Sequence, residues 1–159
     1  MKITSTAFID GGFIPAQHSR RGGDASPPLT ISGVPPGTIS LALVCHDPDA
    51  PRPDGFAHWV VWNIAPDTRE IASGKLPSGA IEGLNDWGAH HWGGPQPPGG
   101  VHRYIFYLYA LDTLLSLPTS TNRRSLEETI QNHLLETATT TGLFGVGLRE
   151  SAARRATHE

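Results

Sequence analysis

Two histidines and an aspartate lie at the edges of strongly apolar segments of the sequence. Asp47 follows one such segment, and His58 and His102 lie at the start of two others. An imidazole can give or take a proton near neutral pH, and a carboxylate can orient an imidazole by accepting its N–H. Together, these residue types suit a small anion site or a general acid–base site. Taken singly, Asp47 also fits an Asx turn, and His58 also fits a histidine satisfied within a core.

A loop of unusual composition precedes His102. Residues 93–100 are all Gly or Pro except Gln96. Such a loop is stiff and turns tightly, and its glycines let the backbone approach a ligand closely. It leads into a strand-like segment on which alternation places His102 and Tyr104 on the same face. The loop and this face together predict one wall of a binding site.

The neighbours of these residues predict how they are held. Arg103 points away from the face of its two neighbours, and we expect its guanidinium to pair with a carboxylate behind the wall, either Asp49 or Asp86. Strict alternation along its own segment places His58 on the face that carries the apolar Val60.

The sequence offers less support for a disulfide, for a Cys or Ser nucleophile, or for a metal site. Cys45 is the only cysteine, so an internal disulfide is excluded, and it lies in an apolar segment without the surroundings of a nucleophile. There is no Gly-x-Ser-x-Gly motif. His90 and His91 are adjacent, and in an extended segment they point to opposite sides, which does not suit one metal ion. Metal binding by His58, His102, Asp47 or the His90–His91 pair is a minor third alternative, and the sequence predicts no metal and no cofactor.

The composition limits the classes of partner. The chain has 159 residues, a net charge of −3 and only 17% charged residues, which does not fit a nucleic-acid-binding protein. It contains no apolar run long enough for an integral membrane segment and no signal-like apolar stretch near Met1. The single cysteine suits a reducing compartment. These features predict a cytoplasmic protein that does not bind nucleic acid and has no integral membrane segment.

The elements that must position the candidate residues are mostly strands. Segments 39–46, 57–64 and 101–111 are apolar on both faces, which is typical of central strands covered on both sides. Segments 3–8 and 29–31 are weaker strand candidates, nearer an edge. Gly (18) and Pro (14) make up about a fifth of the chain, which favours many connections and few long helices.

One helix is predicted near the C-terminus. Ser125 and Glu128 have the spacing of a capping box, and Gly142 suits a helix end. Between them, apolar residues recur at i+4 spacing: Leu126, Ile130, Leu134 and Ala138. The last stretch, 149–159, alternates charged residues with alanine and fits a short helix or a frayed tail. The predicted fold class is therefore mostly β, with one or two helices near the C-terminus.

Four segments, in this order, resemble the phosphatidylethanolamine-binding protein family, and most closely its bacterial branch, the Raf-kinase-inhibitor-like proteins. They are residues 47–51, 58–64, 83–88 and 94–104. The resemblance extends over about residues 1–142, which predicts a single domain there and a C-terminal tail over 143–159. It implies a large central β-sheet flanked by a smaller sheet, with helices near the C-terminus.

The same resemblance implies a small anion pocket at one end of the sheet. Its residues would be Asp47, His58, Pro95, Pro97, His102 and Tyr104, supported by Asp49, Asp86 and Arg103. We expect each histidine to offer an N–H to the anion. Because a carboxylate repels an anion, we expect Asp47 to accept from one imidazole, or to face the ammonium of a zwitterionic headgroup.

The sequence departs from the family pattern at two positions where bacterial relatives commonly carry cysteine. Arg20 and Gln96 stand there, so a bridge between the two positions is absent. The loop would then be less constrained, and Arg20 or Arg21 would add positive charge near the pocket mouth. His46 stands where the family often has a further Asp, which makes the strand end less acidic.

Two classes of function follow. The first is a non-catalytic binding module for a phosphate-type or carboxylate group, such as a phosphorylethanolamine-like headgroup or a phosphorylated protein partner, with a kinase-regulating role by analogy to the family. The second is a hydrolase in which His58 or His102, oriented by Asp47, activates a water for attack on a small ester or phosphoester. A homodimer through an exposed sheet face is compatible with either function.

Overall fold

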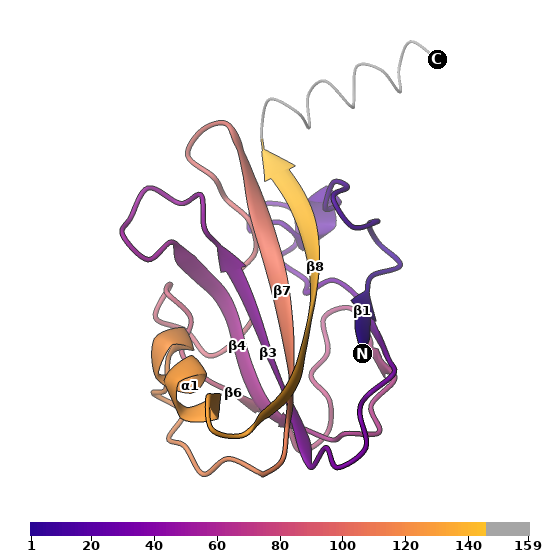
Figure 1. Cartoon of the computed structure of the whole chain (residues 1–159). Helices are drawn as coiled ribbons and strands as arrows, with labels where there is room; N and C mark the ends of the chain where they lie inside the picture. Colours follow the sequence, from indigo (N-terminus) through magenta and orange to yellow (C-terminus); the bar gives the residue numbers. More distant parts are fainter. Residues whose placement is uncertain (146–159) are drawn as a thin grey trace.

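The structure is a computed structural model that describes residues 1–145 (Figure 1). Within these residues, eight strands, one short 3₁₀ segment and one α-helix follow each other. They are β1 (Lys2–Thr4), η1 (Ala16–His18), β2 (Leu29–Ser32), β3 (Ser40–Asp47), β4 (Phe56–Ile64), β5 (Glu70–Ile71), β6 (Ile81–Glu82), β7 (Val101–Leu111), α1 (Arg123–Ile130) and β8 (Leu134–Gly145).

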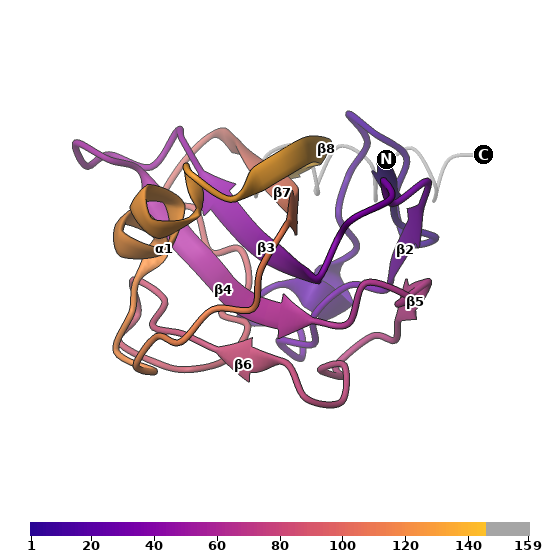
Figure 2. The same ribbon diagram turned by 60° about the horizontal axis from the view of Figure 1, so that its bottom comes forward.

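The strands form two antiparallel sheets. The larger has the order β6-β4-β3-β7-β8, and the smaller has the order β1-β2-β5. Figure 2 shows the small sheet and α1 on opposite sides of the large sheet. The prediction of a mostly β fold, with a large sheet flanked by a smaller one, is confirmed.

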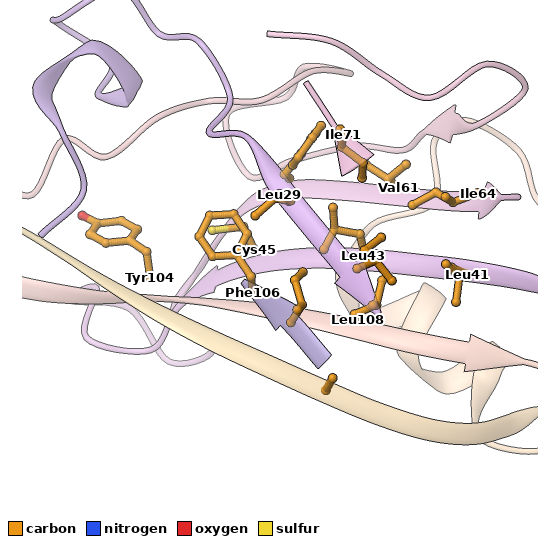
Figure 3. Close-up of a cluster of buried hydrophobic side chains, with 14 of the residues drawn as sticks. Leu29, Leu41, Leu43, Cys45, Val61, Ile64, Ile71, Tyr104, Phe106 and Leu108 are labelled. Carbon is orange, nitrogen blue, oxygen red and sulfur yellow. The ribbon is translucent and has the colours of Figure 1, made fainter. Parts of the chain in front are cut away.

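Both faces of the large sheet are covered, which explains why its central strands are apolar throughout. On one face, Leu29 and Ile71 of the small sheet pack in the same cluster as Leu43 and Phe106 (Figure 3). On the other face, Leu126 of α1 packs in one cluster with Val44 of β3 and Trp62 of β4. Residues 41–45 of β3 are completely buried as a result.

The predicted helix from Ser125 to Gly142 is wrong over most of its length. The helix is Arg123–Ile130, and its N-cap is Asn122, whose Oδ1 accepts from the Ser125 amide at 3.0 Å. The chain then turns back as β8, which pairs with β7 from end to end. Four threonines between 137 and 141 favour a strand, because a β-branched side chain packs well on a pleated surface.

Strand β8 also includes the first residues of the predicted tail. Leu143 lies opposite Arg103, and Gly145 lies opposite Val101. Outside the large sheet, Phe13 forms a parallel bridge with Leu143. The rest of the predicted tail, including the alternating stretch 149–159, lies outside the described residues.

The topology brings one end of β3 to the starts of its two neighbours. Because β3 is antiparallel to both β4 and β7, its last residues lie beside the first residues of each: Asp47 pairs with Phe56, and His46 pairs with Ile105. Three segments that are distant in sequence therefore meet at one end of the large sheet. This end carries the candidate residues.

Candidate functional site

A cavity of about 240 Å³ opens at this end of the sheet. Its lining comes from the ends of β3, β4 and β7 and from the loops beside them. The lining residues are Asp47, Ala50, Pro51, Arg52, Phe56, His58, Trp87, Gln96, Pro97, Pro98, His102 and Tyr104. Five of the six residues that the family resemblance places in a pocket thus share one cavity.

Pro95 is the exception. It lines a neighbouring cavity of about 520 Å³, together with Arg21 and Phe144, and its carbonyl accepts from the Arg20 amide at 3.1 Å. Pro97, Pro98 and Gln96 line both cavities, so the proline loop forms the wall between them.

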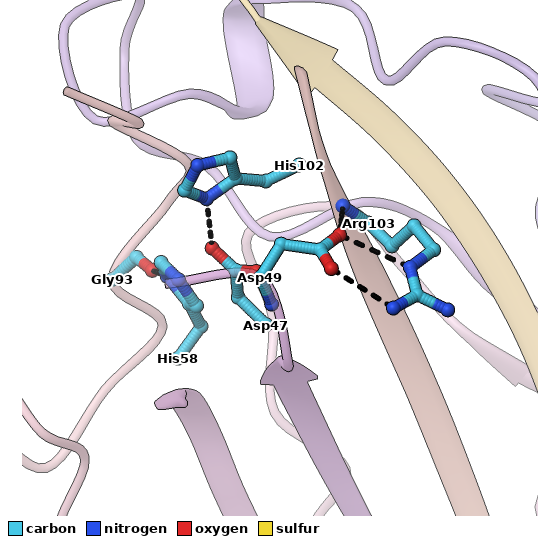
Figure 4. Close-up of polar contacts among 6 residues, drawn as sticks. All are labelled: Asp47, Asp49, His58, Gly93, His102 and Arg103. Atoms are coloured by element: carbon cyan, nitrogen blue, oxygen red, sulfur yellow. Dashed lines mark hydrogen bonds and ion pairs between the residues drawn. The ribbon is translucent and has the colours of Figure 1, made fainter. Parts of the chain in front are cut away.

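The Asp47 carboxylate holds the His102 ring (Figure 4). His102 Nδ1 lies 2.6 Å from Asp47 Oδ2, and Oδ1 of the same carboxylate accepts from the Asp49 amide at 2.8 Å. Because a carboxylate only accepts, Nδ1 carries the proton, and Nε2 of His102 remains for the cavity. The carboxylate therefore orients an imidazole, as the sequence predicts for a group that should not face an anion directly.

His58 is held differently, by a backbone carbonyl. Its Nδ1 donates to the Gly93 oxygen at 2.5 Å, and its side chain is almost completely buried. Burial lowers the pKa of His58 to about 4, so the ring is neutral at neutral pH. Its only N–H then donates to the Gly93 carbonyl, and Nε2 can only accept a hydrogen bond. The expectation that both histidines offer an N–H therefore does not hold for neutral His58.

A β-bulge aims His58 into the site. Cys45 pairs with Trp59 and the next residue, His46, pairs with Ala57, so His58 is the extra residue on β4. Its ring lies 5.1 Å from the Tyr104 ring, between centroids. The prediction that His58 shares a face with Val60 is wrong, because the bulge interrupts the strict alternation on which it depends.

Tyr104 adds a donor to the wall opposite β4. Burial, reinforced by the negative charge of Asp47, raises the pKa of the Tyr104 hydroxyl well above its usual range, so it remains protonated. Within residues 1–145 the hydroxyl has no hydrogen-bond partner. It is not among the fully buried polar groups that lack a partner, since Tyr104 lines the cavity. It is therefore an O–H donor at the cavity.

Arg103 and Asp49 clamp the start of β7 to the loop that follows β3. Arg103 Nε and Nη2 donate to the two carboxylate oxygens of Asp49 at 3.0 and 2.9 Å, and the Arg103 amide donates to Oδ2 at 2.9 Å (Figure 4). The bonds from Arg103 lower the pKa of Asp49 to about 2. Of the two acids expected to pair with Arg103, Asp49 is the partner.

Asp86 has another role. Its Oδ2 accepts from the Ala57 amide at 2.7 Å, and its own amide donates to the Ala57 carbonyl at 2.9 Å. It therefore fixes the loop before Trp87 to the start of β4. Neither Asp49 nor Asp86 lines the cavity, which fits their predicted supporting position.

Arg52 and Phe56 line the cavity but were not singled out from the sequence, and Trp87, expected to pack in the core or at the rim, lines it too. Phe56 and Trp87 form an edge-to-face pair with 4.9 Å between centroids, and Arg52 extends over the Phe56 ring at 5.2 Å. Arg52 lies in the same Pro-rich loop as Asp47, and Trp87 lies in one of the segments that carry the family resemblance. These positions in the sequence are the only indication that Arg52 and Trp87 belong to the site. Nothing in the sequence reveals that their side chains line the cavity.

The described part of the chain contains no group of three His, Cys, Asp or Glu side chains arranged to hold a metal ion. His90 and His91 lie outside the cavity, where their Nδ1 atoms contact the carbonyls of Gly83 and Trp92. Among residues 1–145, no helix is long and apolar enough to cross a membrane.

Comparison with known proteins agrees with this architecture. The family model for phosphatidylethanolamine-binding protein matches residues 4–145. A UPF0098 protein of Methanothermobacter thermautotrophicus is 43% identical over 152 residues, covering 92% of this chain and 100% of that protein.

Two solved structures are similar throughout. CT736 of Chlamydia trachomatis, a putative phosphatidylethanolamine-binding protein homologue, is 39% identical with a TM-score of 0.87, covering 91% of this chain and 97% of that one. YbcL of E. coli, described as a new member of the mammalian PEBP family, is 33% identical with a TM-score of 0.86, covering 91% and 98%. The chain therefore belongs to the phosphatidylethanolamine-binding protein family.

Proposed function

We propose that this protein is a non-catalytic binding module that holds a small phosphate-type or carboxylate group between His58, His102 and Tyr104. The observation that carries the proposal is the His102–Asp47 pair: the carboxylate occupies Nδ1 at 2.6 Å and leaves Nε2 for a ligand. The Tyr104 hydroxyl supplies a second polar contact from the same strand.

The three groups complement a hydrogen phosphate monoester. Tyr104 donates an O–H to a phosphate oxygen, and His102 donates Nε2–H once it carries both protons. The neutral His58 accepts at Nε2, so it suits the remaining P–OH of a singly protonated phosphate, or the O–H of a carboxylic acid. The aromatic rings of Phe56 and Trp87 exclude water and strengthen each of these contacts.

The size of the cavity favours a headgroup rather than a whole lipid. Its volume of about 240 Å³ lies below the roughly 300–1,000 Å³ of pockets that hold drug-sized ligands. A phosphate with a few further atoms, such as phosphorylethanolamine or a phosphorylated side chain of a partner protein, is the matching class. A kinase-regulating role would require the second of these, and a cytoplasmic location, which the free thiol of Cys45 suits, would give access to such partners.

The test is a titration with inorganic phosphate and with phosphorylethanolamine, followed through the imidazole signals in NMR spectra. We expect saturable shifts of the His58 and His102 rings, and we expect His102→Gln to abolish saturation. His133→Gln is the matched control, because His133 also pairs with an aspartate, Asp112, at 2.9 Å but on the exposed surface. Unchanged imidazole signals at millimolar ligand would refute the proposal.

A second candidate is a hydrolase, favoured by the same Asp47–His102 pair, since a carboxylate-oriented imidazole is the arrangement of a general base. No Ser, Thr or Cys within residues 1–145 lines the cavity, so water would be the nucleophile. Turnover of a panel of phosphomonoesters and small carboxylic esters that disappears in His102→Gln would support this function. Ligand binding without turnover of any member of the panel would leave the binding function alone.

A further inference from the structure

Three arginines lie in or near the walls of the cavity, and this inference about its ligand rests on the proposed binding function. Arg52 lines the cavity itself. The Arg20 guanidinium lies 3.8 Å from the ring centroid of Trp87, a lining residue. Arg21 lines the neighbouring cavity and contacts the shared residue Gln96, whose side-chain oxygen accepts from Nε at 2.9 Å and from Nη2 at 3.2 Å in the amide orientation that satisfies both groups.

These three charges are not neutralised by neighbouring carboxylates. Within residues 1–145, the arginines that form ion pairs are Arg103, Arg123 and Arg124. Arg20 and Arg52 instead contact aromatic faces, and Arg21 contacts a neutral amide, so each keeps its full charge for a ligand.

Within residues 1–145, the nearby acids have other partners and form no ion pair with these three arginines; Asp24, beside Arg20, accepts from the Gly94 amide at 2.6 Å. Among the carboxylates of residues 1–145, only Asp47 lines the cavity, and both of its oxygens accept hydrogen bonds, from His102 and from the Asp49 amide. Asp54 and Asp86 line an adjacent cavity of about 180 Å³, which Arg52 also lines. Asp54 lies 3.9 Å from Arg124, and Asp86 accepts from a backbone amide.

We infer that the ligand carries a second anionic group beside the one held by the histidines, and that Arg52, with Arg20 beside Trp87, receives it at the mouth. A carboxylate or second phosphate there gains Coulomb energy from each guanidinium, whereas the ammonium of an ethanolamine headgroup is repelled. Within the proposed class, the arginines therefore favour a phosphomonoester with a neighbouring carboxylate or phosphate over a zwitterionic headgroup such as phosphorylethanolamine. Arg52 is a specificity-determining residue for this choice.

Three probes of similar size separate these alternatives. Glycerol 3-phosphate has a neutral end, 3-phosphoglycerate has a carboxylate at the corresponding position, and phosphorylethanolamine has an ammonium. At low salt, we expect 3-phosphoglycerate to bind about threefold to tenfold tighter than glycerol 3-phosphate, and phosphorylethanolamine to bind most weakly. Added salt should reduce this ranking, since the arginines are near solvent.

Variants assign the preference to the arginines. Arg52→Gln should bring the ratio of the affinities for 3-phosphoglycerate and glycerol 3-phosphate close to one. Arg52→Lys should preserve much of this ratio, because it keeps the charge. Arg69→Gln is the matched control, since Arg69 is exposed and lines none of the described cavities, and it should leave the ratio unchanged. Equal thermal midpoints for the variants would show that each remains folded.

The outcomes distinguish this inference from the function on which it rests. Equal binding of all three probes, or tightest binding of phosphorylethanolamine, would overturn the second-anion inference and leave the anion pocket intact. A preference for 3-phosphoglycerate that survives Arg52→Gln together with Arg20→Gln would also overturn it. If no probe binds, both proposals fail.

Discussion

The two histidines of the cavity differ in what occupies their Nδ1 atoms. His102 donates to a carboxylate, while His58 donates to the carbonyl of Gly93 and is enclosed by aromatic rings. A carbonyl offers no full negative charge to balance an imidazolium, so burial dominates at His58 and the ring is held neutral. This asymmetry makes one imidazole suited to donating toward an anion and the other suited to accepting from it.

The pKa of His58 predicts an acid-sensitive fold. Its pKa is about 4 when folded and 6.5 ordinarily, so between these values the unfolded chain binds more protons. The free energy of unfolding therefore rises with pH across this window, and about 3 kcal/mol is lost on acidification from neutral pH to pH 4. Urea denaturation at several pH values between 4 and 7 measures this slope.

The matched variant for this prediction is His58→Gln. A glutamine amide can still donate to the Gly93 carbonyl but does not titrate, so its unfolding free energy should vary less with pH in this window. His133→Gln, at an exposed histidine, should retain the slope of the original protein. Identical slopes for His58→Gln and the original protein would show that His58 is not the group responsible.

At the scale of elements, α1 and β8 show where a periodic pattern misleads. The apolar spacing of the predicted helix is real for Leu126 and Ile130, which are buried, but Leu134 is 43% exposed. Residues beyond Ile130 gain backbone partners along the whole of β7, which an isolated continuation of the helix would not offer. Pairing with an existing sheet therefore overrides the local spacing.

The N-cap of α1 provides a direct test of where the helix begins. Asn122→Ala removes the oxygen that accepts from the Ser125 amide and should lower the free energy of unfolding by about 1 kcal/mol. Ser125→Ala should change it by less than about 0.5 kcal/mol, because that exposed side chain is not the cap. Chemical denaturation of both variants checks the pair, and the reverse order would move the cap to Ser125.

Gly142 provides a test of how β8 packs. A Cβ at this position would lie 2.4 Å from Ile14 Cγ1 and 3.1 Å from Phe8 Cε2, so there is no room for it. Gly142→Ala should destabilise the protein by about 1–3 kcal/mol through overpacking. Gly99→Ala is the control, since no atom lies within 4 Å of its added Cβ. Equal thermal midpoints for the two variants would contradict this packing.

At the scale of the whole molecule, the site depends on a sheet whose middle is buried and whose edge is only partly covered. β3 has a paired neighbour on each side, and β8 has β7 on one side only. Along the outer edge of β8, the Thr141 amide donates to Asp10, and the Leu143 amide donates to Gly12. By alternation, the amides of Thr137 and Thr139 also face outward, without such partners among the described residues.

Amide hydrogen exchange should be slowest in the buried middle of the sheet and fastest along the uncovered part of its edge. Amides 41–45 of β3 should exchange slowest, near the rate set by global unfolding, because the strand is paired on both sides and buried. Those of Thr141 and Leu143 should be intermediate, and those of Thr137 and Thr139 should exchange fastest. Protection of Thr137 and Thr139 equal to that of Leu143 would indicate that another segment covers this edge.

Much of this protein follows from its sequence alone. The apolar segments 39–46, 57–64 and 101–111 predict the central strands to within about a residue, because burial on both faces leaves a continuous apolar run. The ordered motifs predict the family, the two-sheet fold and five of the residues that meet in the cavity. The ligand class that those motifs imply remains a prediction.

The tertiary structure decided what local pattern cannot encode. The bulge at His58 depends on the register between β3 and β4, and the strand over 134–145 depends on pairing with β7. The neutral state of His58 depends on side chains contributed by distant segments. The access of Arg52 to the cavity depends on such side chains as well. Alternation and spacing describe neighbours in the chain, whereas burial, register and charge at this site are set by neighbours in space.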